Sequence, residues 1–126
     1  MSRSPLTTLA ADLAAVSPDW SAKLRDTPTD IDAATGTLGY ESIREGWLLH
    51  RAQSRLVEGA SPDLALLIGD WCYAAGLVEV TEHGTLDDVA VLAELIADVS
   101  TKPEAATADL EPSWATARAA LDRKTS

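Results

Sequence analysis

The sequence predicts an all-α fold, a single-domain helical bundle of about four to five helices that covers residues 1–126. Hydrophobic residues make up 46% of the chain and Phe is absent, so Ala and Leu dominate a composition that favours helix over sheet. Apolar residues also recur at helical spacing between capping signals. A chain of this length buries one core, whose expected large side chains are Trp20, Trp47, Trp71 and Trp114.

The N-terminal part predicts a helix followed by an irregular segment. Ser4-Pro5 is a start signal, and leucines then recur at helical spacing as far as Val16. Ser17-Pro18-Asp19 ends this helix and begins a short helical turn. Residues 26–39 are rich in Thr, Asp, Pro and Gly, and they therefore predict an irregular connection.

A central pair of helices is expected over residues 40–57 and 62–82. The connection Glu58-Gly59-Ala60 is short, so the two helices should be antiparallel neighbours. On the first of them we expect Glu41, Arg44 and Glu45 to face solvent as ordinary surface charges.

The C-terminal part predicts two further helices. Thr85 and Asp88 have the spacing of a capping box, and an apolar face follows as far as Val99. Residues 100–109 are polar and predict a loop, after which Pro112 should open a last short helix. The basic tail 123–126 is expected to be disordered.

The run from Leu64 to Val80 is almost wholly apolar, yet it contains Asp70. It is shorter than the roughly 20 residues of a membrane span, so we expect no membrane span and a buried central helix instead. A buried carboxylate must be paired, hydrogen-bonded or protonated. Counting back across the turn predicts a buried polar pair between Asp70 and either His50 or Arg51, with a structural ion pair favoured over catalysis.

Three glycines lie inside the predicted central helices: Gly46, Gly69 and Gly76. Each costs about 1 kcal/mol relative to alanine, which suggests a close approach by a backbone, a Trp or a ligand. We expect close packing, with Trp47 or Trp71 filling the gap, and keep a ligand groove as the alternative.

Charge and side-chain chemistry exclude several functional classes. The formal net charge of -10 argues against nucleic acids and anionic membranes as partners. Glu79 and His83 form one i, i+4 pair without a second, so we expect no metal site. Cys72 has no activating neighbour in sequence and no Gly-rich phosphate loop is present, so we expect no enzyme activity and no cofactor. A lone cysteine and no apolar signal segment predict a cytoplasmic protein.

Residues 64–100 carry a partial resemblance to a known family. The segments concerned are Leu66-Leu67-Ile68-Gly69-Asp70-Trp71-Cys72-Tyr73-Ala74-Ala75, Gly84-Thr85-Leu86-Asp87 and Val91-Leu92-Ala93-Glu94-Leu95-Ile96. They resemble a helix pair of the all-helical trans-isoprenyl diphosphate synthases. The similarity is greater to the small non-catalytic subunits of the heteromeric heptaprenyl and hexaprenyl diphosphate synthases than to the catalytic chains.

The chain departs from the catalytic members at their DDxxD motifs, whose carboxylates converge on magnesium. Asp87-Asp88-Val89-Ala90-Val91 lacks the closing Asp, and Asp30-Ile31-Asp32 does not fit either. Of the family motif only Gly69 and Asp70 carry over. The resemblance therefore implies a helical regulatory subunit that helps a catalytic partner to shape an apolar product tunnel.

Three functional hypotheses follow. The first is a non-enzymatic accessory subunit that binds a protein partner or forms a homo-oligomer, in polyprenyl metabolism. The second is a stand-alone module that binds an apolar small molecule or lipid between its helices. The third, an enzyme using Asp70 and His50 as an acid/base pair, ranks last because it lacks any further catalytic group.

Overall fold

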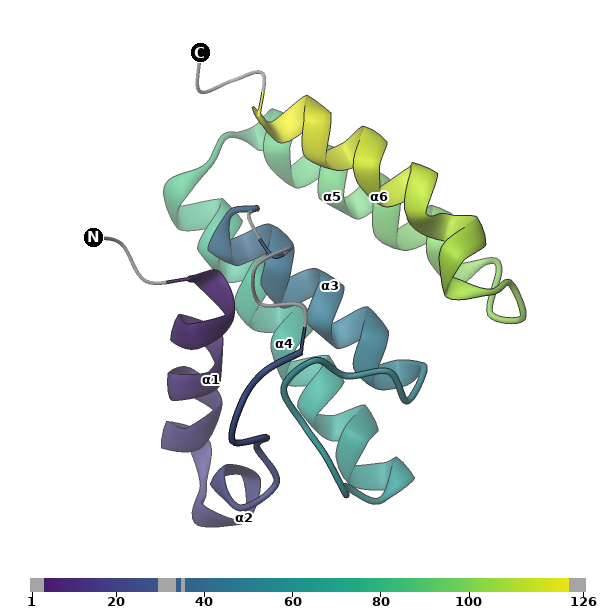
Figure 1. Cartoon of the computed structure of the whole chain (residues 1–126). Helices are drawn as coiled ribbons and strands as arrows, with labels where there is room; N and C mark the ends of the chain where they lie inside the picture. The colour runs from purple at the N-terminus through teal and green to yellow at the C-terminus, as the bar shows by residue number, and fades with distance from the viewer. Residues whose placement is uncertain (1–3, 30–33, 35, 123–126) are drawn as a thin grey trace. The chain divides into compact units, whose positions relative to one another are not determined.

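The computed structural model describes residues 4–29, 34 and 36–122, and within them it contains six helices (Figure 1). The helices are α1 (Pro5–Val16), α2 (Pro18–Ser21), α3 (Leu38–His50), α4 (Pro62–His83), α5 (Leu86–Ser100) and α6 (Thr107–Asp122). The all-α prediction is confirmed. The tail 123–126 and residues 30–33 and 35 of the expected 26–39 connection lie outside the described residues.

The chain divides into two compact units, residues 1–79 and 80–126. The predicted single domain stays a prediction. In the first unit, α1 packs against α2 and α3. Its apolar core is formed by Leu6, Leu9, Leu13, Trp20, Ala34, Leu49, Leu56, Val57, Ile68 and Cys72.

Local signals fix the starts of several helices as the sequence predicts. The Ser17 hydroxyl accepts a hydrogen bond from the backbone N–H of Trp20 at the start of α2. The Ser61 hydroxyl accepts one from the N–H of Leu64 in the first turn of α4, at 3.2 Å. Such caps satisfy N–H groups that have no partner inside the helix.

The helix predicted over residues 40–57 ends earlier, because α3 stops at His50. The backbone turns at Ala52, where φ is +59°. Residues 54–58 then pass beside residues 23–29, with one antiparallel bridge between Leu24 and Val57. The N–H of Arg25 donates to the Leu56 carbonyl at 2.7 Å, and the N–H of Glu58 donates to the Lys23 carbonyl at 2.8 Å.

Glycines let α3 and α4 approach each other closely. A Cβ added at Gly46 would lie 2.7 Å from the carbonyl oxygen of Gly69, and one added at Gly76 would lie 2.8 Å from that of Gly39. The contacts confirm the predicted close packing, and they are made by backbone and by the side chains of His50, Ile43 and Tyr73 rather than by the expected Trp. The pairing also confirms that the two helices are antiparallel neighbours.

The second unit is a pair of adjacent helices, α5 and α6 (Figure 1). The capping box is confirmed, since Thr85 and Asp88 exchange side-chain to backbone hydrogen bonds of 3.0 and 3.2 Å. The prediction that Pro112 opens the last helix is wrong, because α6 begins at Thr107. A proline removes a single backbone donor, and buried Leu110 and Trp114 flank it within the helix.

We predict that Gly76→Ala destabilises the protein. Alanine in an open helix position gains about 1 kcal/mol over glycine, whereas here its Cβ would overlap the Gly39 carbonyl and Ile43. Overpacking of this kind costs about 1–3 kcal/mol, so the free energy of unfolding in urea should fall. The control is Ala74→Gly on the exposed side of α4, which should lose only the propensity term of about 1 kcal/mol. An increase in stability for Gly76→Ala would contradict the close contact.

Candidate functional site

A charged cluster lies buried in the first unit, and we call Glu41, Glu45 and Arg55 the Glu–Arg–Glu centre. Residue exposure is 2% for Glu41, 0% for Glu45 and 5% for Arg55. The prediction that Glu41 and Glu45 face solvent is therefore wrong. Both glutamates lie one turn apart on α3, and Arg55 reaches them from the segment 54–58 that follows this helix.

Glu45 holds the segment 54–58 in place through both carboxylate oxygens. Its Oε1 accepts from Nε of Arg55 at 2.9 Å. Its Oε2 accepts from the Ser54 hydroxyl and from the backbone N–H of Arg55 at 3.1 Å. The N–H of Leu56 points at the same oxygen from 3.4 Å. A side chain of α3 thus accepts hydrogen bonds from buried backbone donors that follow this helix.

Glu41 ties the start of α3 to the same arginine. Nη1 of Arg55 donates to its Oε1 at 2.8 Å, and Nη2 donates to its main-chain carbonyl at 3.2 Å. The second oxygen, Oε2, accepts from the N–H of Gly36 at 3.0 Å. Burial disfavours the charged form of Arg55, but the charges and hydrogen bonds of the two glutamates outweigh it and raise the pKa of the guanidinium.

The predicted contact between Asp70 and His50 is present, but its predicted burial is wrong. Nε2 of His50 lies 3.0 Å from Oδ1 of Asp70, and the Asp70 side chain is 70% exposed. Arg51 instead lies over the ring of Trp47, 5.0 Å from its centroid. The apolar run around Asp70 suggests burial, but Asp70 lies on the exposed side of α4. The His50 ring of α3 contacts Asp70 and also packs against the neighbouring Gly69.

Two groups on α4 have raised pKa values. Burial, and then the charge of Asp70, raise the pKa of Tyr73 to about 12. Burial, and then the charge of Glu45, raise the pKa of Cys72 far above its usual range. The buried Cys72 thiol therefore stays protonated at neutral pH and is a poor nucleophile.

α4 is apolar on both sides, so its prediction as a fully buried central helix is wrong. By length and composition it could cross a membrane, and 28% of its most apolar window is buried. Leu66, Leu67 and Val78 are 48%, 56% and 55% exposed. We define the outward face of α4 as the exposed residues Leu66, Leu67, Asp70, Ala74 and Val78.

A groove of about 330 Å³ opens beside this face, between α1, α3 and α4. We call it the α1–α4 groove. Its apolar lining consists of Leu9, Leu38, Trp71, Ala74, Ala75 and Val78. Its polar lining consists of Asp12, Ser42 and Glu79. Trp71, one of the tryptophans predicted at a gap, packs edge-on against Trp20 with 6.3 Å between ring centroids.

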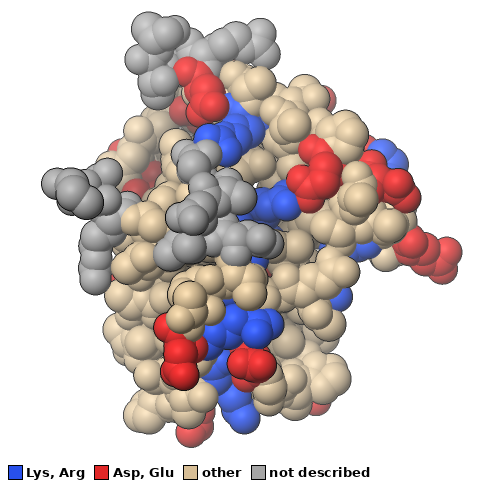
Figure 2. All heavy atoms as spheres, viewed as in Figure 1, with Lys and Arg blue, Asp and Glu red and all other residues tan. Residues whose placement is uncertain are grey.

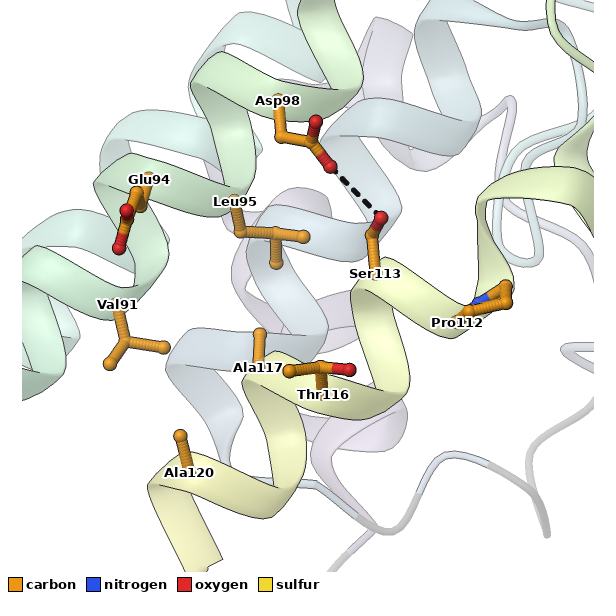
Figure 3. A pocket seen from close by; sticks show the side chains of 9 residues that line it. All are labelled: Val91, Glu94, Leu95, Asp98, Pro112, Ser113, Thr116, Ala117 and Ala120. Atoms are coloured by element: carbon orange, nitrogen blue, oxygen red, sulfur yellow. Dashed lines mark hydrogen bonds between the residues drawn. The ribbon is translucent and has the colours of Figure 1, made fainter.

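A second groove, of about 560 Å³, lies between α5 and α6 (Figure 3). Asp98 points across it to the Ser113 hydroxyl, which donates to the carboxylate at 2.9 Å. Hydrogen bonds from Lys102 and then Ser113 lower the pKa of Asp98. The carboxylate that faces this groove is therefore already engaged within the hairpin.

Among the described residues, one group has metal-ligand chemistry within a short distance. Ligand atoms of Glu79, Glu82 and His83 lie within 4.8 Å of one another. They come from one turn of a single helix, and Glu82 and His83 are exposed. Figure 2 shows that Lys and Arg side chains on the visible face lie among Asp and Glu side chains rather than in one broad basic area.

No known protein family, curated protein or solved structure matches the chain. The described residues combine a buried charged centre with an apolar helix face that is partly exposed.

We predict that Arg55→Met strongly destabilises the protein. The substitution leaves two buried carboxylates without their cation, and breaking a buried pair in this way costs about 3–5 kcal/mol. Urea unfolding followed by circular dichroism measures the loss. The control, Lys102→Met, removes a cation from an exposed pair with Asp98 and should cost less than about 1 kcal/mol. Equal effects of the two substitutions would contradict the buried centre.

The raised pKa of Tyr73 predicts a stability change at high pH. The folded state favours the neutral phenol, so the stabilisation is fully present below pH 10 and is lost as pH rises from 10 to about 12. The difference in unfolding free energy between the native chain and Tyr73→Phe should therefore change across this interval and stay constant below it. Asp70→Asn should lower the Tyr73 pKa, measured by phenolate absorbance. An unchanged pKa in that variant would contradict the proximity of the two groups.

Proposed function

We propose that this chain is a non-enzymatic, cytoplasmic accessory subunit that binds a catalytic polyprenyl diphosphate synthase through the outward face of α4. The observation that carries the proposal is the exposure of large apolar side chains on one helix. Leu66, Leu67 and Val78 are each about half exposed, and they lie within about three and a half helical turns. Contiguous apolar surface of this kind marks sites of protein interaction.

The packing of α3 against α4 supports a surface of fixed shape. Gly46 and Gly69 bring the two backbones together on the inner side of α4, so the position of the helix is set independently of a partner. A preorganised face loses little conformational freedom on binding. The chemistry of the interior supports a non-catalytic role, since the Glu–Arg–Glu centre is sealed from solvent and its groups are bonded to one another.

The choice of a polyprenyl synthase as partner rests on the sequence resemblance over residues 64–100. Gly69 and Asp70, the two positions that carry over from the family motif, lie at the α3 contact and on the outward face respectively. Their placement gives each a physical role in a binding subunit: Gly69 permits the helix contact, and Asp70 presents a carboxylate beside the exposed leucines.

The α1–α4 groove supports a second candidate function, the binding of an apolar small molecule. Its volume of about 330 Å³ lies at the lower end of the range for small-molecule sites, and most of its lining is apolar. This candidate does not explain the exposed Leu66 and Leu67, which are absent from the groove lining. The accessory subunit is therefore the better supported function.

Co-expression with the trans-isoprenyl diphosphate synthase of the same genome tests the proposal. We expect a stoichiometric complex in size-exclusion chromatography with light scattering. Leu67→Glu should weaken it at least tenfold, because burying an unpaired charge at an interface is costly. The matched control is Leu86→Glu in the second unit, where the native leucine is 87% exposed.

Two results would count against this proposal. One is separate elution of the two proteins at every concentration tested. The other is recovery of this chain alone from its native host with an apolar molecule bound in stoichiometric amount, which would favour the second candidate function.

A further inference from the structure

We infer that the α1–α4 groove and the adjoining outward face of α4 bind a basic amphipathic helix of the partner, with an apolar side chain in the groove and Lys or Arg against its acidic rim. This inference rests on the proposed function and specifies which segment of the partner is bound. The groove, the exposed helix face and the local charge are three separate observations that agree with it.

The apolar part of the surface has the pattern of a helix–helix seam. Leu67, Trp71, Ala74 and Val78 follow one another at spacings of four, three and four residues along α4. A repeat of this kind keeps one stripe facing a second helix over its whole length. The α1–α4 groove is lined by three of these residues, Trp71, Ala74 and Val78, so the seam and the groove share a surface. Hollows that accept an apolar anchor are where binding energy concentrates.

The formally charged residues that line the groove or belong to the outward face are all acidic, and one of them, Asp70, also contacts His50. The polar lining of the groove includes the carboxylates of Asp12 and Glu79 and no Lys or Arg. The outward face carries Asp70, and Asp63 is exposed at the start of the same helix. From Pro62 to Glu82 the helix contains no Lys or Arg at all. Opposite charge on the ligand helix would complement this rim and direct its orientation.

The same charges argue against two other occupants. A second copy of α4 would place acidic side chains against acidic side chains, and like charges brought together at an interface are unfavourable. An anionic lipid surface would be repelled in the same way, because the chain as a whole has a formal net charge of -10.

The experiment uses the full chain and two labelled synthetic helices of about 18 residues, long enough to be helical in water. One has Leu on its apolar face and Lys elsewhere, and the other has Glu in place of every Lys. Fluorescence anisotropy should show the Lys helix binding at least about tenfold more tightly than the Glu helix, with affinity falling as salt rises. Equal affinity for the two helices would overturn the inference.

Matched variants separate the groove from the general charge of the protein. Asp12→Asn/Glu79→Gln should weaken the Lys helix several-fold, whereas Glu94→Gln/Glu104→Gln removes the same charge from exposed positions of the second unit and should have little effect. Asp12→Lys tests the same acidic rim with one substitution at an exposed position of α1, and it should likewise weaken binding of the Lys helix. Ala74→Trp should fill the groove and abolish binding. Equal weakening by the two double variants would overturn the inference.

Two further outcomes keep this inference distinct from the proposed function. If the synthase binds and is sensitive to Leu67→Glu but not to the groove variants, the accessory role stands and the inference about the groove is wrong. If the Lys helix binds as expected and no synthase does, the surface is correctly identified and the proposed partner is wrong. Binding of the chain to anionic vesicles without binding of the Lys helix would identify a lipid surface and overturn the inference.

Discussion

The buried Glu–Arg–Glu centre is the constraint on which the arrangement of the first unit depends. Two carboxylates and one guanidinium cannot remain in an apolar interior unless hydrogen bonds replace the water that they lose. Here those bonds come from the backbone around Gly36 and from residues 54–56, so the centre fixes the segment before α3 and the segment after it. Because α3 ends at His50, the chain returns beside residues 23–29, and α4 then packs against α3 at the glycine contact.

The glycine contact determines what α4 can do. Because Gly69 and Gly76 face α3 at backbone distance, the inner side of α4 is fully used for packing. Its opposite side is also apolar, and among the described residues Leu66, Leu67 and Val78 on that side are each about half exposed. In a protein with a formal net charge of -10, such a side is the natural place for association. The fold supports the proposed role because α4 is buried on one side and leaves the other side exposed.

Local signals in the sequence predict much of this fold, and long-range contacts account for what the sequence does not predict. Caps such as Thr85 with Asp88 act within one helical turn, so they are visible without a structure. Counting residues across a short turn predicts the contact of Asp70 with His50, although the connection between α3 and α4 covers residues 51–61. The exposure of Asp70 is not predicted, because α4 is apolar on both sides and its pattern does not distinguish the buried side from the exposed side. Glu41 and Glu45 resemble surface charges until the structure places Arg55 between them. In the sequence, the one signal of this arrangement is that the two glutamates are one helical turn apart.

The most direct test of this account is hydroxyl-radical footprinting of the isolated chain and of its complex with the proposed partner, the polyprenyl diphosphate synthase. The account predicts that Leu66, Leu67 and Val78 are labelled in the isolated chain, that buried Ile68 is not, and that the first three become protected in the complex while Leu86 stays reactive. If the three side chains resist labelling in the isolated chain, or remain equally reactive in the complex, the outward face of α4 is not the binding surface.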